Sequence, residues 1–163
     1  MNARAALTTL VAGLDQAYNR QSWHGTNLRG SLRGVTVKQA AKRPGDRPGR
    51  HNIWELVVHA AYWKYTVLRR LTGQKRGSFP LDGSNFFTRP IDTDNMTDRA
   101  WRADIALLDR MHRDLRAAIV ALPPGRLNSK AKGAKTTNAF LIQGIAAHDL
   151  YHAGQIQLLK RLS

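Results

Sequence analysis

The stretch NIWELVVHAAYWKYTVLRRLTG, residues 52–73, decides the fold. Asn52 is a good N-cap, and Glu55 stands three residues later, where a capping box places its acid. Gly73 follows the stretch, as glycine commonly does after a helix. Apolar residues surround almost the whole axis, and a helix of that kind is buried on most sides. The stretch therefore predicts a buried helix over residues 52–72, with His59 in its middle.

Three further segments carry apolar residues at helical spacing and predict long helices over residues 3–21, 97–122 and 137–161. A short helix over residues 36–42 is also expected, with Thr36 as its cap. No segment shows a convincing strand pattern. Four long helices joined by loops of mixed length predict an all-α fold, a four-helix bundle built as a single domain over residues 1–163.

Composition narrows the class of protein. Hydrophobic residues make up 42% of the chain and aromatic residues 7%, which is typical of a globular protein. The chain has no cysteine, which excludes disulfides, thiolate metal sites and a cysteine nucleophile. The apolar runs are too short to span a membrane, and the N-terminus lacks the apolar core of a signal peptide. These features lead us to expect a cytoplasmic protein without a membrane partner.

The formal net charge of +15 raises the question of a nucleic-acid partner. The basic residues, however, are spread along the chain, and we find no nucleic-acid recognition motif. A specific nucleic-acid function is therefore not the favoured interpretation. Attraction of anionic small molecules is an equally good use of the charge.

A second stretch, HDLYHAGQ at residues 148–155, carries the clearest chemical signal. His148 and His152 are four residues apart on a predicted helix, so their Cβ atoms lie about 5–6 Å apart on one face. That spacing allows both imidazoles to bind one metal ion. His59 is a third inward-facing histidine, and three protein ligands leave an open position, as in catalytic metal sites. The alternative is that these are buried histidines satisfied by ordinary hydrogen bonds.

Other polar residues carry weaker signals. Gln155 lies one turn beyond His152, where it would contact a water or substrate at the open position, or make a polar contact between helices. His24 either lines the mouth of the pocket or is a loop residue near a helix end. His112 is buried in a helix seam and is a candidate polar group near the site. Asp149 could orient an imidazole, but its position favours an exposed acid.

The stretches HDLYHAGQI (148–156) and NIWELVVHAAYW (52–63) together resemble the DinB/YfiT-like family. In this family a four-helix bundle carries a motif of the form H-x-x-x-H-x-G-Q on its last helix and a single histidine on its second. Trp23-His24-Gly25 is also similar to members of the group, whereas Asp149 replaces a commoner Glu. The resemblance implies an up-down-down-up bundle, metal ligands at His59, His148 and His152, and a homodimer.

The ligand set suits Zn²⁺, Ni²⁺, Fe²⁺ or Mn²⁺, and the sequence does not choose among these metals. Relatives in the family include S-transferases that use low-molecular-weight bacterial thiols such as bacillithiol, and mycothiol-dependent isomerases. The resemblance therefore implies that a small-molecule thiol attacks an electrophilic substrate at the metal, with Gln155 or His24 orienting the incoming group. Two alternatives stay open: a metal-dependent hydrolase, and a non-catalytic, stress-associated metal-binding protein.

Overall fold

The computed structural model describes residues 2–47, 49–130 and 134–162. Within these ranges the chain is all-helical, apart from an isolated β-bridge between Lys130 and Thr137. The long helices are α1 (Ala3–Tyr18), α4 (Ile53–Thr72), α5 (Asp98–Val120) and α6 (Asn138–Leu162). The short ones are α2 (Leu28–Ser31), α3 (Val37–Ala41) and two 3₁₀ turns, η1 (Pro44–Asp46) and η2 (Pro124–Arg126). The all-α prediction is confirmed.

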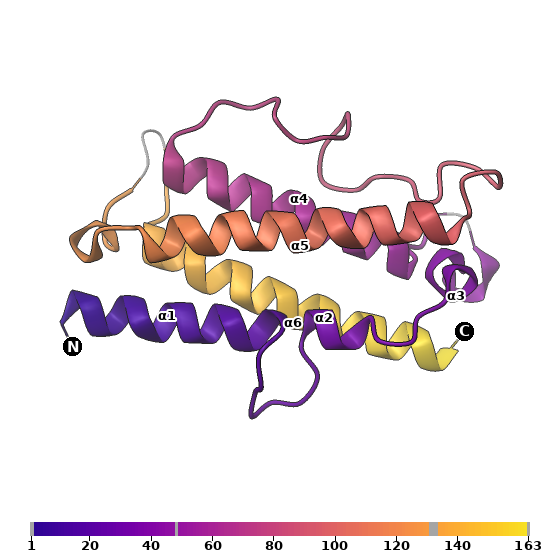
Figure 1. The fold of residues 1–163 in the computed structure, drawn as a ribbon, viewed down its shortest axis with the longest axis horizontal. Helices are drawn as coiled ribbons and strands as arrows, with labels where there is room; N and C mark the ends of the chain where they lie inside the picture. Colours follow the sequence, from indigo (N-terminus) through magenta and orange to yellow (C-terminus); the bar gives the residue numbers. More distant parts are fainter. Residues whose placement is uncertain (1, 48, 131–133, 163) are drawn as a thin grey trace.

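The four long helices lie side by side as a bundle (Figure 1). Figure 1 shows α1 and α6 running in one direction and α4 and α5 in the other, which is compatible with an up-down-down-up arrangement. α4 packs against both α5 and α6, and α1 packs against α6. The two helices that carry the candidate ligands are therefore in direct contact.

The N-terminal third differs from the sequence-based expectation in two places. α1 ends at Tyr18, three residues before the predicted end, because the N–H groups of Asn19 and Arg20 both turn back to the Asp15 carbonyl. The following loop contains the unpredicted helix α2, whose N-cap is the side chain of Asn27. A helix of four residues is too short to show a periodic pattern, which explains why it was missed.

The start of α4 is fixed by Asn52. Its side-chain oxygen accepts a hydrogen bond from the Glu55 N–H, as predicted for an N-cap. Its amide nitrogen donates to the carbonyl oxygens of Ala41 and Arg89, at 3.1 and 2.6 Å. Asn52 is fully buried. It therefore joins three segments: the end of α3, the start of α4 and the end of the long α4–α5 loop.

The carboxylate of Glu55 does not complete the expected capping box. It accepts hydrogen bonds from the Arg43 guanidinium and the Arg89 N–H, and it pairs with Nδ1 of His51. Burial alone would raise the pKa of Glu55, but the bonds from Arg43 and His51 hold that pKa below its ordinary value. A charged guanidinium is a stronger partner than one backbone N–H, so the buried carboxylate pairs with Arg43 of the preceding loop instead of the Asn52 N–H.

The α4–α5 loop runs back along the bundle from the end of α4 to the start of α5 (Figure 1). Its aromatic residues hold it against α4: Phe79 and Phe87 pack against Tyr62, with ring centroids 5.3 and 5.6 Å away. Phe87 is buried. This packing brings residues 85 and 86 beside the middle of α4.

Replacing Asn52 by alanine should destabilise the protein by about 3 kcal/mol, because it removes one helix cap and leaves two carbonyl groups without their donor. Thr97, an exposed N-cap of α5 whose side chain accepts a hydrogen bond from the Ala100 N–H, provides the matched control. Thr97→Ala should cost about 1 kcal/mol. Urea denaturation measures both values, and equal losses would contradict the joining role of Asn52.

Candidate metal centre

His59 of α4 and His148 and His152 of α6 meet inside the bundle. The Nε2 atom of His148 lies 3.1 Å from Nε2 of His59 and 3.1 Å from Nε2 of His152. The potential ligand atoms of the three residues all lie within 4.8 Å of one another. The spacing of four residues on α6 thus places both imidazoles on one face, as predicted, and α4 adds the third.

Two of the imidazoles are held in a defined tautomer. Nδ1 of His59 lies 2.9 Å from the Asn85 carbonyl oxygen, and Nδ1 of His152 lies 2.6 Å from Oε1 of Gln155. Both partners are acceptors, so each Nδ1 carries the proton. The Nε2 atoms of His59 and His152 therefore present lone pairs to the space that they share with His148, as metal-binding histidines do.

The arrangement leaves a polar conflict that hydrogen bonding alone does not resolve. Nε2 of a neutral His148 carries at most one proton, so it donates to one of its two neighbours at a time. Nδ1 of His148 is buried and has no hydrogen-bond partner among the described residues. A cation ligated by nitrogen would satisfy all three Nε2 lone pairs together. The donor set therefore fits a divalent metal.

Burial also keeps these groups neutral. Desolvation lowers the pKa of His148 to about 3, with further lowering by His152 and His59. Desolvation, followed by the charge of His59, lowers the pKa of His152 to about 4. The pKa of His59 is lowered by the same cause. At neutral pH all three imidazoles are uncharged, which is the form that binds metal.

The histidine cluster opens into a cavity of about 810 Å³. Residues of α4, α6 and the α4–α5 loop line it, together with Pro44, Gly49, Arg50 and His51. Apolar and aromatic residues dominate the wall: Leu56, Trp63, Phe86, Tyr151, Leu158 and Leu159. A cavity of this size with a few converging polar groups is typical of a small-molecule site.

Asn85 and Phe86 are site residues that the sequence did not reveal. Asn85 has a φ of +66°, a left-handed conformation that asparagine tolerates better than most residues. Its carbonyl holds His59, and its side-chain oxygen accepts a hydrogen bond from Nε1 of Trp63 at 3.0 Å. The Phe86 ring stacks on His59 at 4.0 Å. No spacing rule predicts which residues of such a loop reach the site. The one available signal was an asparagine followed by aromatic residues within a polar segment.

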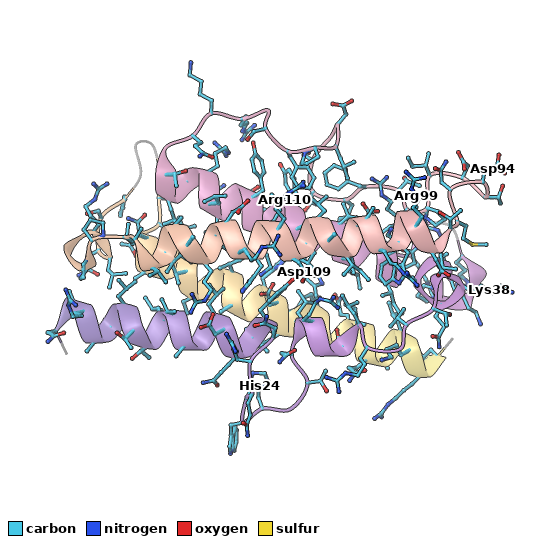
Figure 2. The ribbon with its side chains drawn as sticks, viewed as in Figure 1. His24, Lys38, Asp94, Arg99, Asp109 and Arg110 are labelled. Atoms are coloured by element: carbon cyan, nitrogen blue, oxygen red, sulfur yellow. The ribbon has the colours of Figure 1, made fainter. Side chains whose placement is uncertain are left out.

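The structure separates the weaker candidates. Gln155 lines the cavity, and its contact is to His152 on its own helix rather than to another helix. His24 is exposed in the loop after α1, on the outside of the bundle, and it does not line the cavity (Figure 2). Because α1 ends early, that loop extends away from the cluster. The prediction that His24 reaches the pocket mouth is therefore not supported.

His112 is buried, as predicted, but it is not part of the cavity. Its ring stacks on Tyr18 of α1 with centroids 3.6 Å apart. Nδ1 of His112 has no hydrogen-bond partner among the described residues. Desolvation, with a smaller contribution from the charge of Lys64, lowers the pKa of His112 to about 3.

The prediction that Asp149 is exposed is wrong. Asp149 and Lys64 are both fully buried and form an ion pair between α6 and α4, with Nζ and Oδ2 2.5 Å apart. Because α6 packs against α1 and α2 as well as α4, the face beside the histidines is also interior. Burial raises the pKa of Asp149 and lowers that of Lys64, and the attraction between the two charges opposes both shifts. Lys64 is the single charged residue between positions 56 and 68, a signal that the sequence did offer.

The comparisons with known proteins identify the family. A family model described as the DinB superfamily matches residues 2–156. The chain belongs to the DinB superfamily. Neither a curated protein nor a solved structure matches it. The DinB match contains His59, His148 and His152, which confirms the resemblance on which their expected role rests. Among the described residues, no helix is both long and apolar enough to cross a membrane.

Lys64→Met and Asp149→Leu should each destabilise the protein by about 3–5 kcal/mol, because each leaves the other charge buried and unpaired. The double variant should be more stable than either single variant, since two apolar side chains pack without an unpaired charge. A double-mutant cycle measured by urea denaturation tests this. Asp15→Leu and Arg116→Met, which break a partly exposed pair between α1 and α5, should cost about 1 kcal/mol or less. Additive losses for the buried pair would contradict the argument.

Stability should fall when the metal-free protein is acidified. Below the ordinary pKa of 6.5, His112 takes up a proton in the unfolded chain but not in the folded one, until the pH reaches about 3. This one group lowers the free energy of unfolding by about 1.4 kcal/mol per pH unit within that window. His112→Phe keeps a ring against Tyr18 and removes the titration, so its stability should fall less steeply between pH 6.5 and 4. Equal slopes in denaturation measured across this range would contradict the assignment.

Proposed function

We propose that this DinB-superfamily protein is a metal-dependent enzyme whose divalent cation is held by Nε2 of His59, His148 and His152. The observation that carries the proposal is the convergence of three Nε2 atoms, two of them with fixed lone pairs, on the wall of an open cavity. Imidazole ligands suit zinc, nickel, iron(II) or manganese(II). The apolar surroundings and the absence of thiolate ligands do not favour one of the four.

The lining of the cavity supports transfer of an external thiol. Among the described lining residues there is no serine, threonine, lysine or carboxylate that would act as a covalent nucleophile. A reaction between two molecules that both enter from solution fits this lining. A divalent cation on the three imidazoles would supply a Lewis acid that lowers the pKa of a thiol. The protein's own part is to hold that site through Gln155 and Asn85, which fix two of the imidazole tautomers. We therefore infer a thiol S-transferase that uses a low-molecular-weight bacterial thiol and an electrophilic substrate.

A metal-dependent hydrolase is the second candidate, and one observation favours it. His51 lines the same cavity, and its Nδ1 lies 3.0 Å from Oε2 of Glu55. If Nδ1 carries the proton, Nε2 is an acceptor able to take a proton from water as a general base. A hydrolase would turn over without thiol, whereas a transferase requires it.

We further propose that the protein is cytoplasmic and forms a homodimer, as the sequence led us to expect.

Untagged protein should contain about one equivalent of a first-row metal by elemental analysis, because three neutral imidazoles converge on one point. His59→Ala and His152→Ala should lose the metal. His24→Ala is the matched control and should keep it, since His24 lies outside the cavity. The metal-loaded protein should consume a model electrophile, such as monobromobimane, in the presence of a bacterial thiol. Rates in His152→Ala should fall by about 100-fold or more.

Two results would overturn the proposal in different ways. A parent protein that binds no metal after metal is added back at neutral pH would remove the site. Metal-loaded protein that cleaves p-nitrophenyl acetate without thiol, and activates no thiol, would replace the transferase by the hydrolase.

A further inference from the structure

The fixed charge in the cavity beside the histidines is positive only, among the described residues that line it. Arg50 is the one permanently charged residue among the described lining residues, and no carboxylate accompanies it. Arg50 forms no ion pair with a carboxylate of the described residues. An exposed guanidinium at the edge of an apolar cavity is available to a ligand from solution.

The backbone of Arg50 is held in place by the buried Glu55. The Arg43 guanidinium pairs with Glu55 and also donates a hydrogen bond to the Arg50 carbonyl oxygen at 2.5 Å. The next residue, His51, pairs with Oε2 of the same carboxylate, which also accepts a hydrogen bond from Arg43. Arg50 is therefore anchored beside the start of α4, although its own side chain reaches solvent.

Stacked rings link this anchor to the metal centre. The His51 ring stacks on Phe86 at 3.6 Å, and Phe86 stacks on His59 at 4.0 Å. One aromatic ring thus separates the neighbour of Arg50 from a candidate ligand. The two imidazole rings cover both faces of Phe86, so a ligand in the cavity that Arg50, Phe86 and the histidines line meets the edge of the Phe86 ring.

The opposite wall is apolar and open to water. Tyr151 is 64% exposed and Leu158 is 58% exposed, and both line the cavity from the same face of α6. Removing such surface from water is favourable, at about 25 cal/mol per Å². A ligand with an apolar body gains this free energy, whereas a small polar thiol does not.

We propose that the cavity binds an organic acid with one anionic group and an aromatic or aliphatic body. Arg50 binds the anionic group, and Tyr151, Leu158 and the edge of the Phe86 ring contact the body. This inference rests on the proposed function, because it assigns this class of compound to the electrophilic substrate rather than to the thiol. Guanidinium and carboxylate match in charge and shape, which makes Arg50 the residue that selects the acid.

The test compares 4-phenylbutanoate with 4-phenylbutan-1-ol, which has the same body without charge. Binding to metal-free and zinc-loaded protein is followed by tryptophan fluorescence, since Trp63 lines the cavity. The acid should bind about three- to fivefold more tightly than the alcohol to both forms, as expected for a solvent-exposed ion pair. Arg50→Gln should abolish this preference and leave binding of the alcohol unchanged. Arg47→Gln, an exposed arginine of the same loop that does not line the cavity, should keep the preference.

Three results would overturn the proposal. Equal affinity for acid and alcohol would remove the role of charge. A preference that needs zinc and survives in Arg50→Gln would place the acid on the metal. Failure of both probes to bind, together with a dimer that loses stability in Leu158→Asp, would assign the apolar wall to a second copy of the chain. If the metal-loaded protein activates no thiol, the proposed transferase is wrong. The preference of the metal-free protein for the acid can still be measured in that case.

Discussion

The buried ion pair between Lys64 and Asp149 is the constraint on which the rest of the structure depends. It joins α4 to α6 five residues after His59 and directly after His148. A buried charge without its partner costs several kcal/mol, so the two helices pack in the register that brings these charges together. Sliding α6 by one turn would displace its side chains by about 5.4 Å and separate both the ion pair and the imidazoles. The Lys64–Asp149 ion pair does not line the cavity, but it sets the relative position of the three histidines that do.

Register alone does not orient an imidazole ring, and here the loop and the end of α6 complete the site. Asn85 fixes the His59 tautomer through a backbone carbonyl, and Gln155 fixes that of His152 from the next turn of its own helix. The carbonyl comes from a long loop, which is held in place by aromatic packing against α4. Rigid helices thus supply the ligands, and an anchored loop supplies their orientation, a common division in functional sites.

The parts of this arrangement that follow a period could be predicted from the sequence. Apolar spacing gave the long helices, and the separation of His148 and His152 gave one face of the cluster. Asp149 was misjudged because its burial depends on how many helices surround α6, which a single helix does not reveal. His24 had two interpretations, and the structure agrees with a loop residue near a helix end, because His24 is exposed after α1 and does not line the cavity. Asn85 contributes a backbone carbonyl, and sequence carries no signal for which carbonyl a fold will bring to an imidazole.

The cavity would carry an excess of positive charge once a divalent metal is bound. Three neutral imidazoles would leave a bound dication with both of its charges, and the described residues that line the cavity include no acid to offset them. The chain as a whole carries a net charge of +15, which makes an uncompensated cation less favourable still. Arg50 adds a further positive charge at the rim. This charge balance supports an anionic ligand, because an anion at Arg50 would lower the electrostatic free energy of the guanidinium and of the positively charged surface together.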